Sequence, residues 1–344
     1  MMRRGWTVLV GAVVLLALSV GLSYLPVPYV ALGPGPTLDT LGKSDGKAII
    51  TISGRKTSTS EGHLNLTTVS VRDHIDLATA LRFWIDGAVA VVPRELVYPP
   101  DQSEKQVEAE NEQAFKASQT SAETAALRKL GFPVQVTIAS LPDGSPSAGK
   151  LLKGDVVKAL DGKPVTSQAR LVELVRDHRI GETVTVDYLR NGKPGSVKVV
   201  TGGAGKGDQR RTVIGVSVEQ KQPHPFHVSF DLDRIGGPSA GLMFALAVID
   251  KLEPADLTGG TFIAGTGEID DDGNVGPIGG IPQKMIAARD AGATIFLTPK
   301  DNCAEAVKTV PDGLRLVKVA TLDDALESLR MLREKSGTPP TCPR

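Results

Sequence analysis

Ser239 is the first residue whose surroundings suggest nucleophilic chemistry. It lies in the glycine-rich hexapeptide 236–241, GGPSAG, which opens an apolar run that predicts a helix over 239–252. Glycines permit tight backbone turns, proline suits a first helical turn, and free N–H groups at a helix start can stabilise an oxyanion. The alternative is an N-cap serine, the commoner role of a serine before a helix.

Lys284 is the residue best placed to act as a base for this serine. It stands near the start of a second predicted helix, 282–291, among the apolar residues Ile281, Met285 and Ile286. A lysine has a reference pKa of ~10.4, so it can accept a proton at neutral pH only where burial lowers that pKa. The alternative is a solvent-facing lysine on a helix surface.

Histidine offers a second choice of base. His227 lies on a predicted strand just before Ser239 and could form a triad with Asp233. The remaining histidines have no evident partners in the sequence: His63, His74, His178 and His224.

Residues 212–335 resemble the proteolytic domain of Lon proteases. The family's blocks appear in order as Gly237–Gly241, Thr266–Ile269, Gly276–Gly280 and the helix that holds Lys284. The resemblance implies a catalytic dyad of Ser239 and Lys284, supported by Thr266, which can hydrogen-bond the lysine amine, and by Gly237.

The sequence also departs from that family. Soluble Lon carries an ATPase module that we do not find here, so ATP-independent activity is expected. Of the family's common Lys-Glu-Lys, only Lys284 is present, because the helix begins Pro-Gln-Lys. The tetrapeptide PSAG recurs at 146–149 without the other blocks, and its Ser147 is interpreted as a loop residue.

Residues 126–201 resemble a PDZ domain. The Gly154-Asp155 turn, the Asp161-Gly162 turn, a helical stretch and the Arg190–Gly192 hairpin follow that family's order. PDZ domains add an extended peptide end to a sheet edge beside a helix, so peptide recruitment is expected. A spacer of similar strand content is the alternative.

The glycine-rich segment 202–211 is predicted to be a linker. Its Gly205-Lys206 pair is followed by glycine instead of the serine or threonine of a phosphate loop, so no ATP and no other cofactor is expected. The formal net charge of +0 argues against nucleic acid, which usually requires a basic face. The two cysteines, Cys303 and Cys342, are too few for a metal cluster and either pair or remain free.

The amino terminus predicts a single-pass membrane anchor over 1–28. An apolar run from Gly5 to about Leu25 follows Arg3-Arg4, and no Lys or Arg comes before Lys43, which predicts a cytoplasmic amino terminus and an extracytoplasmic remainder at the cell membrane. A cleaved signal peptide is the alternative, although the run exceeds the usual ~7–15 apolar residues.

The fold class expected is α+β, with a transmembrane helix, a β-rich PDZ-like domain and a Lon-type α/β domain. Residues 29–125 hold a connector, early strands over 48–69 that belong to the protease fold, and a helical region. Within that region, 101–121 is either a solvated helix or a linker, and 336–344 is a tail.

The function expected is that of a membrane-anchored, ATP-independent serine endopeptidase acting on unstructured or membrane-proximal proteins. A catalytically silent PDZ scaffold that binds peptides at the membrane is the rival. Lon-like domains often form rings, so the resemblance is compatible with a homo-oligomer, but the sequence does not set the number of subunits.

Overall fold

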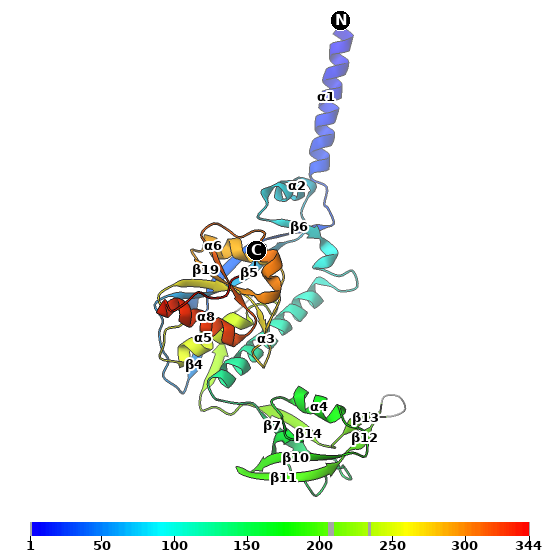
Figure 1. The fold of residues 1–344 in the computed structure, drawn as a ribbon. Helices are drawn as coiled ribbons and strands as arrows, with labels where there is room; N and C mark the ends of the chain where they lie inside the picture. The colour runs from blue at the N-terminus through cyan, green and yellow to red at the C-terminus, as the bar shows by residue number, and fades with distance from the viewer. Residues whose placement is uncertain (1, 206–209, 233–234, 344) are drawn as a thin grey trace. The chain divides into compact units, whose positions relative to one another are not determined.

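The computed structural model describes residues 2–205, 210–232 and 235–343 and divides into two compact units. Unit 1 comprises Met1–Ala126 and Phe226–Arg344, and unit 2 comprises Leu127–Pro225 (Figure 1). The chain therefore leaves unit 1 after its early strands and returns to it after unit 2. This is the interrupted arrangement expected from the sequence.

A six-stranded sheet forms the centre of unit 1, in the order β20-β19-β16-β5-β1-β6. β16 runs parallel to both β5 and β19, whereas β1 is antiparallel to β5 and β6. Direct pairing of β5 with β16 joins the early and late parts of the chain in one sheet. The strands are β1 Tyr29–Asp39, β5 His63–Arg72, β6 Ala90–Pro93, β16 Phe262–Gly265, β19 Ile295–Pro299 and β20 Arg315–Val319.

Helices and short strand pairs complete unit 1. The sequence of α5 is apolar on every side, and α5 is accordingly buried from Leu242 to Val248. The helices are α1 Met2–Ser23, α2 Leu77–Asp86, α3 Glu104–Lys129, α5 Gly241–Leu252, α6 Ile281–Asp290, α7 Cys303–Ala306 and α8 Leu322–Glu334, with short turns η1 Arg94–Leu96 and η3 Lys300–Asn302. The paired short strands are β2 Lys43–Ser44 with β3 Lys47–Ala48, β4 Ile50–Ser53 with β15 His227–Phe230, and β17 Glu268–Ile269 with β18 Val275–Gly276.

The polar stretch 101–121 proves to be mostly helix, because α3 covers Glu104–Lys129. Its charged side chains face solvent, while Phe115, Ser118 and Ala122 are buried. Phe115 packs edge-on against Phe244 of α5, with ring centroids 5.7 Å apart. α3 is therefore packed against the core of unit 1 along its middle turns.

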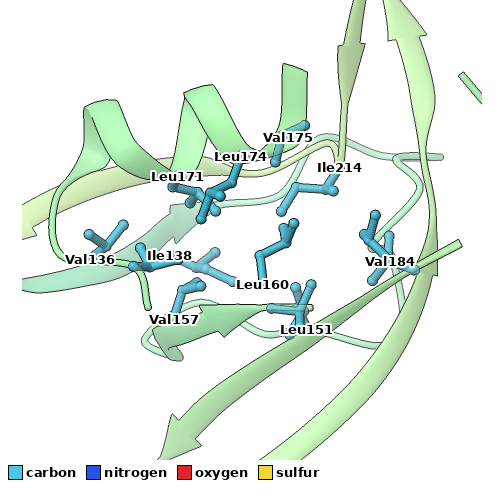
Figure 2. Close-up of a cluster of buried hydrophobic side chains, with 13 residues drawn as sticks. Val136, Ile138, Leu151, Val157, Leu160, Leu171, Leu174, Val175, Val184 and Ile214 are labelled. Atoms are coloured by element: carbon cyan, nitrogen blue, oxygen red, sulfur yellow. The ribbon is translucent and has the colours of Figure 1, made fainter. Parts of the chain in front are cut away.

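Unit 2 is built on an antiparallel sheet in the order β11-β10-β8-β7-β14, with β9 beside β8. Figure 2 shows Leu171 and Leu174 of α4 pointing toward Ile138 and Leu160 in the core beneath the helix. The elements are β7 Gln135–Ser140, β8 Val156–Leu160, β9 Lys163–Pro164, α4 Gln168–Arg176, β10 Thr183–Arg190, β11 Lys193–Val200, β12 Gly202–Ala204, β13 Arg211–Val213 and β14 Ser217–Lys221.

The segment that follows the predicted PDZ-like domain lies in unit 2, which ends at Pro225. The linker predicted over 202–211 contains β12, which pairs with β13, and β14 pairs with β7 inside unit 2. Residues 212–225 thus belong to unit 2 of the structure. The pattern of 213–218 predicts one strand, whereas the structure divides the segment between the end of β13 and the start of β14. A local pattern also does not say which sheet a strand joins.

The amino-terminal run forms α1. Within the described part of the chain, we find no helix of the length and apolar character that a membrane crossing requires. The predicted transmembrane span is therefore not found there.

Cys303 and Cys342 form a disulfide bridge, with their Cα atoms 5.1 Å apart. The bridge and a hydrogen bond from Lys318 N to Pro340 O (2.9 Å) hold the predicted tail against β20 and α7. Because the bridge closes a loop with a sequence separation of 39, its removal should destabilise the protein by ~2–4 kcal/mol. Thermal unfolding with and without reductant tests this, and a Cys303→Ser/Cys342→Ser variant should show no response to reductant. An unchanged melting temperature of the wild type on reduction would contradict the expectation.

Candidate active site

Three residues from separate elements meet at one point in unit 1. Lys284 Nζ donates hydrogen bonds to Ser239 Oγ (2.8 Å) and to Thr266 Oγ1 (3.1 Å). Thr266 Oγ1 in turn donates to the carbonyl oxygen of Ser239 (3.0 Å). The structure therefore brings together the serine, lysine and threonine that the sequence analysis selected.

Ser239 lies in the loop before α5, which begins at Gly241, two residues later than predicted. The N-cap residue is Ala240, so the alternative of Ser239 as an N-cap does not hold. Gly237 has φ +83°, a left-handed conformation that strains residues with a Cβ. The loop is also held by a hydrogen bond from Gly267 N to Ser239 O (2.8 Å).

Lys284 is only 3% exposed, in the first turn of α6. The start of α6 can approach β5 closely because residue 280 is a glycine: a Cβ there would lie 2.6 Å from Val69 Cγ2. Burial lowers the pKa of Lys284 to about 8, and the negative charge of Glu268 partly opposes that shift. The low pKa gives the lysine a substantial neutral fraction near physiological pH.

Sequence reasoning assigned no role to Glu268, although it belongs to the Thr-Gly-Glu block. Its effect on Lys284 depends on the turn between β16 and β17, which only the folded chain reveals. Glu268 itself is exposed, so solvent screens its charge.

A cavity of about 460 Å³ opens beside the dyad. Its walls combine the end of β5 with the loops before α5 and α6, and Ser239 and Lys284 both reach it. Apolar lining residues are Leu32, Leu66, Val69, Ile235 and Ile278. The cavity is large enough to hold side chains of a peptide next to the nucleophile.

The other candidate residues lie elsewhere. His227 is exposed on β15, and Asp233 lies outside the described residues. Ser147 is fully buried in unit 2 and donates to Ile214 O (2.5 Å), so it has a structural role. The four histidines without evident partners in the sequence do have them in the structure. His63 Nδ1 lies 2.8 Å from Asp39, His178 Nε2 lies 3.0 Å from Asp161, His74 Nε2 lies 3.8 Å from Asp73, and His224 Nδ1 lies 2.6 Å from the carbonyl oxygen of Gln222.

One group of side chains in unit 1 has the spacing of metal ligands: Asp73, His74 and Glu104. Arg94 donates hydrogen bonds to both carboxylates of this group. The guanidinium of Arg94 already pairs with both carboxylates, so we assign no metal to this group.

Comparison with known families agrees with both parts of this description. Residues 218–331 match the Lon protease (S16) C-terminal proteolytic domain, and residues 106–201 match the PDZ domain. This chain combines a PDZ domain with a Lon-type proteolytic domain. The match to the Lon-type domain contains Ser239, Thr266 and Lys284.

The curated relatives are Lon proteases. Lon protease 2 of Bacillus subtilis is 28% identical over 59% of this chain and 34% of its own length. Lon protease of Clostridioides difficile is 40% identical over 29% of this chain and 13% of its own length. The chain thus spans about a third or less of these relatives. Among solved structures, the PDZ domain of the SdrC-like protein from Listeria monocytogenes matches 24% of this chain and 85% of that chain, at 22% identity and a TM-score of 0.23.

Proposed function

We propose that this protein is an ATP-independent serine endopeptidase in which Ser239 is the nucleophile and Lys284 the general base. The observation that carries the proposal is the 2.8 Å contact between Lys284 Nζ and Ser239 Oγ, made by a lysine that is almost completely buried. A serine hydroxyl needs an adjacent base to attack a carbonyl, and a desolvated lysine can act as that base.

In the first half of the reaction, neutral Nζ takes the proton of the Ser239 hydroxyl as Oγ attacks the peptide carbonyl carbon. The tetrahedral intermediate collapses when Nζ gives that proton to the leaving amine, which leaves an ester on Oγ. In the second half, Nζ takes a proton from water, whose oxygen attacks the ester carbon. Return of the proton to Oγ releases the carboxylic acid product and restores Ser239.

Thr266 and the backbone of the nucleophile loop support these steps. Thr266 Oγ1 accepts a hydrogen bond from the Lys284 amine and donates one to the Ser239 carbonyl, so it holds the amine beside the nucleophile. Among the described residues, the N–H groups of Ser239 and Ala240 make no hydrogen bond within the chain. They are therefore free to donate to the oxyanion of the intermediate.

The test is hydrolysis of fluorescein-labelled, unfolded casein by the full chain, without ATP, across pH 6–10. Because the base must be neutral, kcat should rise as pH passes through about 8 and level off above it. Ser239→Ala should remove the activity at every pH without changing the melting temperature. A requirement for ATP would contradict ATP independence, and an inert wild type that still binds peptides would favour the scaffold instead.

The PDZ domain is proposed to recruit peptide ends. In unit 2, a cavity of about 420 Å³ lies between α4 and the segment 214–218, next to β14, which is an edge strand of the sheet. An edge strand beside a helix suits the addition of an extended peptide. Val172→Glu, which places a charge in this groove, should abolish binding of labelled carboxy-terminal peptides, and unchanged binding would contradict the assignment.

The cellular location is proposed to be the cell membrane, with unit 1 and unit 2 extracytoplasmic and with substrates that are unstructured or membrane-proximal. The support is the apolar surface of α1, on which Trp6, Leu9 and Leu16 are exposed, together with the basic residues that precede the run. Recovery of the full chain in the supernatant after membrane sedimentation would overturn this proposal.

A further inference from the structure

The peptide bond between Pro238 and Ser239 is fixed by a hydrogen bond from α3, a helix outside the nucleophile loop. The carbonyl oxygen of Pro238 accepts a hydrogen bond from Ser118 Oγ of α3 (2.8 Å) and a longer one from Gly241 N (3.4 Å). The preceding N–H, that of Gly237, donates to Asn111 O, also on α3 (2.9 Å). α3 thus contacts both the entry to the loop and the peptide that carries the Ser239 N–H.

Ser118 is well suited to a positioning role. A serine inside a helix usually bonds to a carbonyl of its own preceding turn, but the hydroxyl of Ser118 crosses to a residue 120 positions away. Ser118 is only 5% exposed, so water does not compete for this bond. The approach is close: a Cβ on Gly241 would lie 2.9 Å from Ser118 Oγ.

A planar trans peptide couples its two ends, since the N–H points opposite to the C=O. A bond that fixes the Pro238 carbonyl therefore also fixes the direction of the Ser239 N–H. We infer that Ser118 is a positioning residue for catalysis, which aims the Ser239 N–H at the site of the oxyanion. The inference rests on the proposed function, because it assigns Ser118 to the same reaction.

Oxyanion donors act only on the charge that develops in the transition state, so their misalignment lowers kcat and leaves substrate binding alone. Loss of one such donor typically costs about 10²–10³-fold in kcat. Ser118→Ala keeps the Ser239 N–H but removes the hydrogen bond that orients its peptide. We therefore expect kcat to fall about 10–100-fold, with KM within about twofold of the wild-type value. The pH at which kcat rises should stay the same, because Lys284 is not touched.

Ser121→Ala is the matched control. Ser121 stands one turn further along α3 and donates a comparable bond to Asp271 Oδ1 (2.9 Å), away from the nucleophile loop. Both variants lose one hydroxyl and one hydrogen bond of the same helix, so a purely structural role predicts the same small effect for both. We expect Ser121→Ala to keep kcat within about twofold of wild type.

The experiment measures kcat, KM and the pH profile of the full chain and both variants on labelled unfolded casein. The rate at which a fluorophosphonate labels Ser239 is measured beside them, because that adduct is tetrahedral and needs the same oxyanion donor. Slower labelling and lower kcat in Ser118→Ala alone support the inference. Equal behaviour of the two variants, a loss that lies in KM, or a shifted pH profile would overturn it. If wild type and Ser121→Ala neither cleave nor label, the proposed function fails instead, and this inference falls with it.

Discussion

Lys284→Met is expected to lower kcat at least about 10³-fold while leaving the protein as stable as the wild type or more so. Methionine fills nearly the same volume as lysine but cannot accept a proton. The reference pKa of this lysine is 10.5, and burial lowers it to about 8 in the folded state. The buried cation therefore costs about 3 kcal/mol at pH 7, since each pKa unit corresponds to ~1.36 kcal/mol.

The pH dependence of this destabilisation follows from the difference between the pKa values of Lys284 in the folded and unfolded states. The unfolded chain binds the lysine proton more tightly, so the cost grows as pH falls below 10.5 and is complete below about 8. The stability gained by Lys284→Met should therefore be largest below pH 8. The variant also lacks the hydrogen bonds that Lys284 makes with Ser239 and Thr266, and this loss offsets part of the gain. Denaturant unfolding at pH 7 and pH 10 measures the difference.

Lys251 provides a control for this substitution. It is a second partly buried lysine with a pKa lowered by burial, but it stands in α5 and donates to Leu41 O, outside the cavity. Lys251→Met should keep kcat within about threefold. If Lys284→Met remained active while the enzyme still required Ser239, Lys284 would not be the base.

Thr266→Val is expected to lower kcat about 10–100-fold at pH 8, by analogy with residues that orient a catalytic base. Valine has the shape of threonine, so the fully buried site stays filled, but both hydrogen bonds of Oγ1 disappear. The lysine amine then loses the partner that holds it toward Ser239. The Ser239 carbonyl keeps the bond from Gly267 N, which limits the loss of stability to about 1 kcal/mol.

Thr40→Val separates the catalytic effect from a stability effect. Thr40 is also fully buried in unit 1, and its hydroxyl donates to Leu64 O (2.7 Å) away from the cavity. The two variants should lose similar stability in denaturant unfolding, and only Thr266→Val should lose activity. Equal activities would show that Thr266 has no part in the reaction.

Much of the fold was accessible from local pattern. The apolar run of α5, the alternation of β10 and the motif order of the Lon-type domain all predicted elements that the structure contains. At the boundary between the domains, the segment predicted as a linker contains β12, and β14 pairs with β7 in the sheet of unit 2. Strand pairing depends on residues far apart in the sequence, so residues 202–221 alone do not indicate that β14 pairs with β7.

The candidate residues of the site could be selected from the sequence alone, because glycine, proline and serine share one hexapeptide and a single lysine stands at a helix start. The tertiary structure decided whether they meet. Pairing of β5 with β16 and the close approach of α6 to β5 bring Ser239, Thr266 and Lys284 to hydrogen-bonding distance across separations of 27 and 45 residues. The burial of Lys284, which lowers its pKa, is likewise a property of the packed unit. Ser118 lies in α3, a segment whose composition was equally consistent with a solvated helix and a linker. The sequence could not assign its hydrogen bond, because the acceptor, the carbonyl oxygen of Pro238, lies 120 residues away.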